Sequence, residues 1–188
     1  MDVNRFKIQG RIASKFRGDG FLSFIIAVRD DGAHTNFPRI TFLDKRILDD
    51  IYAEYDVGDY VCVSGAVQTS RVYNTQLIGS SIDFAKPNFE VGSQGGRLVN
   101  DVNEVRFVGT INHVFEPNDN ITVITLKTEV DQRVYFPTVT LFGNSGKQFA
   151  GTADGTQVQF LGRVQTKRVT DGEKTKHFES FVGYMEKI

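Results

Sequence analysis

This chain of 188 residues has one cysteine and no long apolar run, so it lacks the features of disulfide-bonded and membrane-spanning proteins. Its single cysteine, Cys62, excludes an internal disulfide and fits a buried strand residue in a reducing, intracellular setting. No apolar run approaches the ~20 residues that a membrane-spanning helix needs, and no apolar stretch follows the N-terminal residues as it does in a secretion signal. We therefore expect a cytoplasmic protein without a membrane partner.

The chain also lacks an excess of charge of either sign, and it lacks the groups of side chains that catalytic and metal sites need. The 22 lysines and arginines are balanced by 23 aspartates and glutamates, so any anionic ligand must be held by a local arrangement. The histidines His34, His113 and His177 fall in different expected elements, with no cysteine or paired carboxylates at metal-ligand spacing. No phosphate-binding glycine loop of the P-loop type is present. We expect no catalytic residue, no metal and no cofactor, and therefore not an enzyme.

An internal repeat is the most informative feature that the sequence does contain. Residues 65–72 and 162–169 share a glycine, a Val-Gln-Thr triplet and an Arg-Val pair, and residues 36–42 recur as 135–141, each with Phe-Pro. Two units of roughly 85 to 90 residues can just fold alone. We therefore predict two tandem units joined by a glycine-containing segment that is extended or flexible. The predicted boundaries are 1–86 for the first unit, 87–102 for the linker and 103–188 for the second unit.

Each unit shows five segments with the alternation of half-buried strands, and a helix-like segment between the third and the fourth. The expected strands cover residues 5–16, 21–29, 36–43, 60–72 and 75–84, then 104–115, 121–129, 134–142, 156–169 and 174–184. The expected helices cover residues 44–55, with Asp44 as N-cap, and 144–150, with Phe149 as the apolar plug. Alternation places four rings in the core, Phe24, Phe84, Phe107 and Phe160. This order predicts an all-β protein of two tandem five-stranded OB-fold barrels. An SH3-like barrel is the alternative, and the helix position argues against it.

Three motifs resemble the bacterial-type single-stranded DNA-binding proteins, including those of phages and plasmids. The motifs are an opening strand from asparagine to glycine, a third strand that ends Leu-Phe-Gly, and a fourth strand in which glycine precedes Gln-Thr and basic residues. They stand at residues 4–11 and 103–110, at 136–143, and at 158–168.

This resemblance implies OB-fold binding and protection of single-stranded DNA without strong sequence preference, in DNA replication or recombination. It makes a phage or mobile element, in a bacterial or infected-host cytoplasm, the expected source. Replication or recombination proteins are further expected partners, although recruitment through the family's acidic tail is doubtful because that tail is missing. A homodimer is expected because two barrels in one chain reduce the number of subunits needed.

Two phenylalanines are the first candidates for contacts with bases. Phe37 and Phe136 share strand parity with polar residues, so both rings are expected on the more polar face of their strands. The alternative is that each ring plugs the mouth of its barrel. The resemblance assigns base stacking to these two rings and to a second aromatic on the same strand, which is Phe142 in the second unit and is replaced by Leu43 in the first.

Polar and basic residues on the fourth strands and the last hairpin complete the expected site. Glutamine can bond base edges, threonine can bond phosphate, and arginine or lysine can neutralise it. A solvated hairpin with no partner is the alternative. The candidate DNA-binding residues are Phe37, Arg39, Gln68, Thr69, Arg71, Tyr73, Phe136, Thr138, Phe142, Arg163, Gln165, Lys167, Arg168, Lys174 and Lys176. Phe115, Tyr135 and Phe178 are further stacking candidates that fit core or rim packing at least as well.

Two functions from different classes stay open. Single-stranded DNA binding is the predicted one, with the second unit as the stronger site because only that unit carries Phe142, Arg163 and Lys167. The rival is an OB-fold scaffold for protein interactions in a replication assembly, with weak or vestigial DNA binding. The near-zero net charge and the fewer aromatics of the first unit favour this rival.

Overall fold

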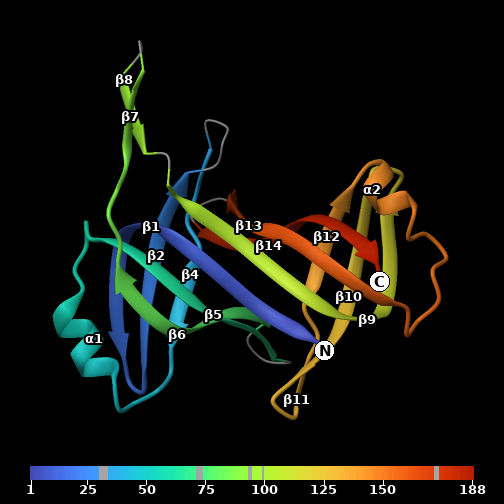
Figure 1. The fold of residues 1–188 in the computed structure, drawn as a ribbon, viewed down its shortest axis with the longest axis horizontal. Helices are drawn as coiled ribbons and strands as arrows, with labels where there is room; N and C mark the ends of the chain where they lie inside the picture. The colour runs from blue at the N-terminus through green and yellow to red at the C-terminus, as the bar shows by residue number, and fades with distance from the viewer. Residues whose placement is uncertain (30–33, 71–73, 93–94, 99, 172–173) are drawn as a thin grey trace. The chain divides into compact units, whose positions relative to one another are not determined.

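The computed structural model covers residues 1–188, and its backbone is described except at 30–33, 71–73, 93–94, 99 and 172–173 (Figure 1). Side chains are described outside residues 30–33, 70–74, 89–99 and 171–177. The chain divides into two compact units. The C-terminal unit comprises residues 1–6, 67–75 and 104–188, and the N-terminal unit comprises 7–66 and 76–103. Each unit therefore takes segments from more than one part of the chain, and the contiguous division expected from the repeat stays a prediction.

The C-terminal unit contains a closed five-stranded barrel. Its strands are β9 (Val102–Asn118), β10 (Ile121–Val130), β12 (Thr138–Phe142), β13 (Gln157–Asp171) and β14 (Lys174–Lys187), with β11 (Arg133–Tyr135) at its side. They pair in the order β10-β12-β14-β13-β9, and β9 pairs again with β10 to close the ring. The pairing of β12 with β14 is parallel, and the other pairings of this ring are antiparallel. The first strand thus contacts the second and the fourth, an arrangement that favours the OB-fold over the SH3-like alternative.

The N-terminal unit follows the same order of pairings. Its elements are β1 (Val3–Gly18), β2 (Phe21–Arg29), β3 (Thr35–Asn36), β4 (Arg39–Phe42), α1 (Leu48–Glu54), β5 (Tyr60–Ser70) and β6 (Asn74–Phe84). The order is β1-β5-β6-β4-β2, with β1 paired to β2 and a parallel pairing of β4 with β6. The segment expected as an extended linker instead contains an antiparallel hairpin, β7 (Phe89–Gly92) and β8 (Gly95–Leu98).

The core of each unit is built from the inward residues of its strands. Phe107 and Phe160 are fully buried in the C-terminal unit and Phe24 is fully buried in the N-terminal unit, as alternation predicted. The prediction was wrong for Phe84, whose side chain is 56% exposed. Leu77 is the inward residue of β6, so period-two alternation sends the even-numbered Phe84 outward.

Both expected third strands are interrupted at their Phe-Pro pairs. β3 ends at Asn36 and β4 begins at Arg39, and β11 and β12 leave the same gap. Proline has no amide hydrogen to donate to a ladder, so the strand cannot continue through it. The proline carbonyls still accept hydrogen bonds, Pro38 from the amide of Ile26 at 3.1 Å and Pro137 from the amide of Leu126 at 2.9 Å.

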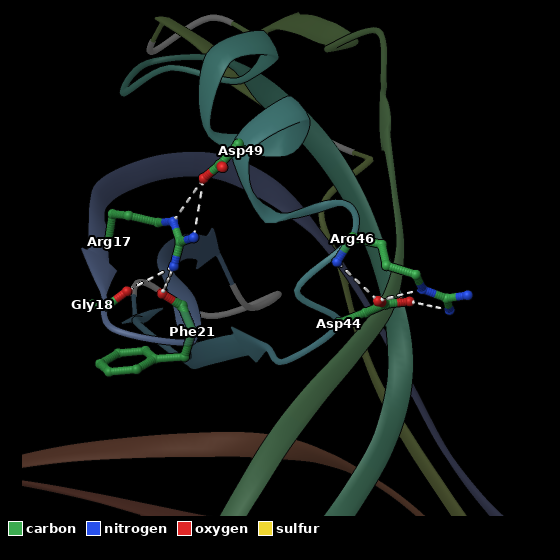
Figure 2. Close-up of polar contacts among 6 residues, drawn as sticks. All are labelled: Arg17, Gly18, Phe21, Asp44, Arg46 and Asp49. Atoms are coloured by element: carbon green, nitrogen blue, oxygen red, sulfur yellow. Dashed lines mark hydrogen bonds and ion pairs between the residues drawn. The ribbon is translucent and has the colours of Figure 1, made fainter.

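The first helix begins later than expected, because Asp44 does not cap it. The Asp44 carboxylate instead accepts hydrogen bonds from the backbone amide and the guanidinium of Arg46, and these bonds lower the pKa of Asp44 to about 2 (Figure 2). α1 is attached to the β1–β2 turn by Arg17, which donates to Asp49 at 3.0 Å and to the carbonyls of Gly18 and Phe21. Arg17 therefore has a local structural role.

The second helix is also shorter than expected. α2 covers only Asn144–Lys147, and turns follow it. Phe149 is nevertheless buried in the C-terminal unit, as expected of an apolar plug. Glycines on β9 and β13 permit the close approach of neighbouring strands in this barrel: a Cβ on Gly109 would lie 2.3 Å from the carbonyl oxygen of Lys127, and a Cβ on Gly162 would lie 2.4 Å from that of Val182.

Candidate nucleic-acid interface

The outer side of β12 carries two of the expected site residues, Thr138 and Phe142, and a third, Phe136, lies two positions before the strand. Val139 and Leu141 are fully buried, so Thr138, Thr140 and Phe142 face outward by alternation. Their cross-strand partners on β10 lie on the same face. The pairs are Thr138 with Thr125, Thr140 with Val123, and Phe142 with Ile121.

β14 lies between this strand and the basic strand β13. Phe181 and Met185 are its inward residues, so Phe178, Val182 and Tyr184 face outward. The register pairs Thr140 of β12 with Val182 of β14. On its other side β14 places Arg163 opposite Val182, Gln165 opposite Ser180 and Lys167 opposite Phe178. The aromatic residues of β12 and the basic residues of β13 therefore share one continuous outer face, with β14 between them.

Exposed aromatic rings are concentrated on this face. Phe115 of β9 joins it through its pairing with Val123. The exposed fractions are 55% for Phe115, 42% for Phe136, 49% for Phe142, 52% for Phe178 and 53% for Tyr184. We call these five rings, with Arg163, Gln165 and Lys167, the outer aromatic face. Rings exposed to this degree contribute little to the core, and a group of them marks a surface that binds a ligand.

Thr69 is held in the C-terminal unit next to one of these rings. Its hydroxyl oxygen accepts a hydrogen bond from the backbone amide of Phe136 at 2.9 Å. The strand that carries Thr69 is fixed by Asn4, whose side chain donates to the carbonyl of Val67 at 2.8 Å and accepts from the amide of Val67 at 2.9 Å. The predicted phosphate contact of Thr69 stays a prediction, and the structure gives this hydroxyl a local partner. Gln68, beside it, is exposed.

Among the residues whose side chains are described, the corresponding face of the N-terminal unit has fewer rings. Phe37 is 46% exposed, and Phe16 is exposed on the same face, because it pairs with Ser23 and Ser23 pairs with Thr41. Arg39 is exposed as well. By the repeat, Leu43 replaces Phe142, Ala66 replaces Arg163 and Ser70 replaces Lys167. By the parallel registers of β4 with β6 and of β12 with β14, Ser80 replaces Tyr184. The exposure of Phe37 and Phe136 agrees with the expected surface position and not with rings that plug the barrel mouths.

The structure does not describe every expected site residue. Arg71 and Tyr73 lie outside the described residues, and so do the side chains of Lys174 and Lys176, whose backbone belongs to β14. Arg168 is exposed, but alternation turns it to the side of β13 opposite Lys167.

Two further basic residues, on the first strands of the units, bind groups within the protein. Arg11 donates to the carbonyl of Gly58 at 2.5 Å. Arg106 donates to Gln159 at 2.6 Å, and the Gln159 amide donates to Glu186 at 3.0 Å. We therefore do not include Arg11 or Arg106 in the interface.

Three aromatic residues of the face are not among the candidate DNA-binding residues of the sequence analysis. Phe115 and Phe178 are there further stacking candidates that fit core or rim packing at least as well, and Tyr184 is in neither group. The alternation of β14 from Phe178 to Tyr184 is a signal that could have identified both of its rings. Alternation within a strand does not predict which strands are neighbours, so it could not show that β14 lies beside β12.

The part of the chain that the structure describes contains no helix long and apolar enough to cross a membrane. The described residues also contain no group of three or more His, Cys, Asp or Glu side chains that could hold a metal ion.

The fold is similar to that of known single-stranded DNA-binding proteins. No protein-family model matches the sequence, and a search of curated proteins finds no match. Among solved structures, the wild-type single-stranded DNA-binding protein from Thermus aquaticus matches with a TM-score of 0.66 and 13% identity over 100% of this chain and 93% of that one. A deletion mutant of the same protein matches with a TM-score of 0.63 and 14% identity, over 100% and 95% of the chains. The mitochondrial single-stranded DNA-binding protein Rim1 from S. cerevisiae matches 46% of this chain, with a TM-score of 0.37 and 24% identity. The expected resemblance is thus confirmed at the level of structure: the chain has the fold of the Thermus aquaticus single-stranded DNA-binding protein.

Proposed function

We propose that this chain binds single-stranded DNA without strong sequence preference through the outer aromatic face of its C-terminal unit. The observation that carries the proposal is the register of β12, β14 and β13, which sets Phe178 opposite Lys167 and Val182 between Thr140 and Arg163, so that exposed rings and cations lie on one outer face. Every base offers a π-face, and stacking on an aromatic side chain contributes ~1–3 kcal/mol per base. Cations beside the rings neutralise the phosphates that connect the bases. Such a face holds a strand and protects it without reacting with it.

The fold and the charge distribution support this proposal. The two Thermus aquaticus structures with the same fold are of a protein described as binding single-stranded DNA. A net charge of −1 makes a general electrostatic attraction weak, so binding must come from a local arrangement such as this face. The tandem OB-fold organisation is part of the proposal, supported by the repeat and by the common order of pairings in the two units. The proposal extends to a role in replication or recombination of a phage or mobile element. It also extends to assembly as a homodimer.

Binding of oligo-dT at two salt concentrations tests the proposal. We expect a fluorescent oligo-dT of about 30 nucleotides to bind at low salt and to bind more weakly as salt rises, because each neutralised phosphate releases counterions. Fluorescence anisotropy gives both affinities. The same measurement with mixed-sequence strands should give similar affinities. Absence of detectable binding at low salt would overturn the proposal.

A single lysine tests the electrostatic part of the face. Lys167→Ala should lower the slope of log K against log salt by about 0.7, the contribution of one phosphate contact to a single strand. The matched control is Lys147→Ala, because Lys147 is an exposed lysine on α2, outside the face. Equal slopes for wild type and the Lys167 variant would remove this lysine from the interface.

A protein-interaction scaffold is the second candidate function. The smaller number of rings on the N-terminal unit favours it, because Leu43 and Ser80 stand where the C-terminal unit has Phe142 and Tyr184. Capture of a replication protein that is unchanged by excess oligo-dT, together with no oligo-dT binding by the chain alone, would select this function over the first.

A further inference from the structure

Phe136 lies in a gap between two strands of the C-terminal unit. β11 ends at Tyr135 and β12 begins at Thr138, and Pro137 between them has no amide hydrogen. The amide of Phe136 donates to the hydroxyl oxygen of Thr69 at 2.9 Å, so a side chain takes the place of a ladder partner. Thr69 belongs to the first copy of the repeat, and its segment 67–75 is part of the C-terminal unit.

The backbone is held on both sides of the Phe136 ring. On one side the amide is bound to Thr69, and on the other side the carbonyl of Pro137 accepts a hydrogen bond from the amide of Leu126 at 2.9 Å. The ring itself is 42% exposed, so core packing fixes it only in part. The direction of an exposed ring then depends on the dihedral angles of its own backbone, which these two hydrogen bonds restrict.

The Thr69 hydroxyl, which accepts this hydrogen bond, is on a strand that other contacts hold in place. Thr69 is half-buried and lies two residues after Val67, which is fully buried and bound at both its amide and its carbonyl by Asn4. A residue on a strand fixed in this way can hold a partner in one orientation, whereas a residue on a free loop cannot.

We infer that Thr69 is a positioning residue, which holds Phe136 at the angle required for base stacking. This inference rests on the proposed function. It means that the interface on the C-terminal unit includes a residue from the first copy of the repeat, because the segment 67–75 is part of that unit. A ring held before binding stacks without the entropy cost of ordering it in the complex.

A direct contact between the Thr69 hydroxyl and a phosphate is the competing role, because a hydroxyl that accepts one hydrogen bond can still donate another. The two roles differ in a double-mutant cycle. A residue that acts through Phe136 has nothing left to act on once the ring is removed. A residue that contacts DNA directly weakens binding to the same extent with or without the ring.

The experiment uses the full chain and oligo-dT, with Thr69→Val, Thr69→Ser and Phe136→Ala as single variants and Thr69→Val combined with Phe136→Ala. Phe136→Ala should weaken binding by about fivefold to a hundredfold, the effect of one stacked base. Thr69→Val, which removes the hydroxyl at constant size, should weaken binding by about twofold to tenfold, the effect of one hydrogen bond. Thr69→Ser keeps the hydroxyl and should bind like wild type. Thr69→Val should have no further effect in the Phe136→Ala background.

A second double-mutant cycle, which combines Thr69→Val with Phe37→Ala, controls for indirect effects. Phe37 is the repeat equivalent of Phe136 in the N-terminal unit, and Thr69→Val should weaken binding to the same extent with and without Phe37. Thermal unfolding of every variant confirms that the comparison is between folded proteins. An undiminished effect of Thr69→Val in the Phe136→Ala background would overturn the positioning role, and so would wild-type binding by Thr69→Val alone.

A measurement without DNA separates this inference from the proposed function. Hydrogen exchange of the Phe136 amide should be at least about tenfold faster in Thr69→Val than in wild type or Thr69→Ser, at equal global stability. Unchanged exchange would show that Thr69 does not hold this amide and would overturn the inference, whatever the DNA result. If the wild-type chain fails to bind oligo-dT, the proposed function fails and the DNA part of the inference fails with it. Faster exchange in that case still establishes Thr69 as the residue that holds Phe136.

Discussion

Alanine in place of Phe142 or of Tyr184 is expected to weaken oligo-dT binding by ~1–3 kcal/mol for each ring, the contribution of one stacked base. Both rings are about half exposed, on neighbouring strands of one face. Neither substitution leaves a cavity in the core, so thermal unfolding should change little. Fluorescence anisotropy at low salt measures the loss. Because the two rings are on neighbouring strands of one face, we expect them to contact adjacent parts of the bound strand, and the double variant should lose less than the sum of the two single losses.

The repeat provides a matched control for this result. Leu43 is the repeat equivalent of Phe142 in the N-terminal unit and is similarly exposed, but it has no aromatic face. Leu43→Ala should therefore change the affinity by less than about 0.5 kcal/mol. Equal losses for Leu43→Ala and Phe142→Ala would contradict base stacking on the C-terminal unit and would point to a general effect of surface hydrophobicity.

Alanine in place of Phe107 is expected to lower the free energy of unfolding by ~3–5 kcal/mol, because it leaves a cavity in the C-terminal barrel. Phe107 is fully buried, and its ring centroid lies 5.8 Å from that of Phe160 and 5.4 Å from that of Phe181. A loss of this size is a large part of the stability of a small domain, so the variant should unfold at much lower urea concentrations.

Phe115 on the same strand is the control for this stability prediction. Its ring is more than half exposed, so Phe115→Ala should change the free energy of unfolding by less than about 0.5 kcal/mol while it weakens oligo-dT binding. Urea denaturation and anisotropy on both variants separate the two roles. A loss below about 1 kcal/mol for Phe107→Ala would show that Phe107 is not a core residue. Unchanged binding by Phe115→Ala would remove that ring from the interface.

Properties that depend on neighbouring residues could be predicted from the sequence. The second strand was predicted at residues 21–29, which are the bounds of β2. The parity of Phe37 and Phe136 with polar residues predicted that both are exposed, and both are, although the strands are interrupted at these positions. Alternation gave the wrong result at Phe84, where the inward position of Leu77 decides the orientation of β6.

Other properties depend on which strands are neighbours, and local patterns carry no information about that. The later start of helix α1 at Leu48 is different, because the Asp44 side chain there binds Arg46, which is only two positions away. Arg17 was no candidate for a contact with the helix, yet folding brings it within 3.0 Å of Asp49.

The sequence by itself determined the internal repeat, the all-β class and the inward position of Phe24, Phe107 and Phe160, since repeats and period-two alternation are written in the order of the residues. The tertiary structure alone decided that β14 lies between β12 and β13, which joins the rings of one strand to the cations of the other. It also decided that Thr69 binds the amide of Phe136, a residue 67 positions away. The physical reason is that strand pairing and hydrogen bonds between distant segments depend on the register of the closed barrel, which forms only when all of its strands are in place.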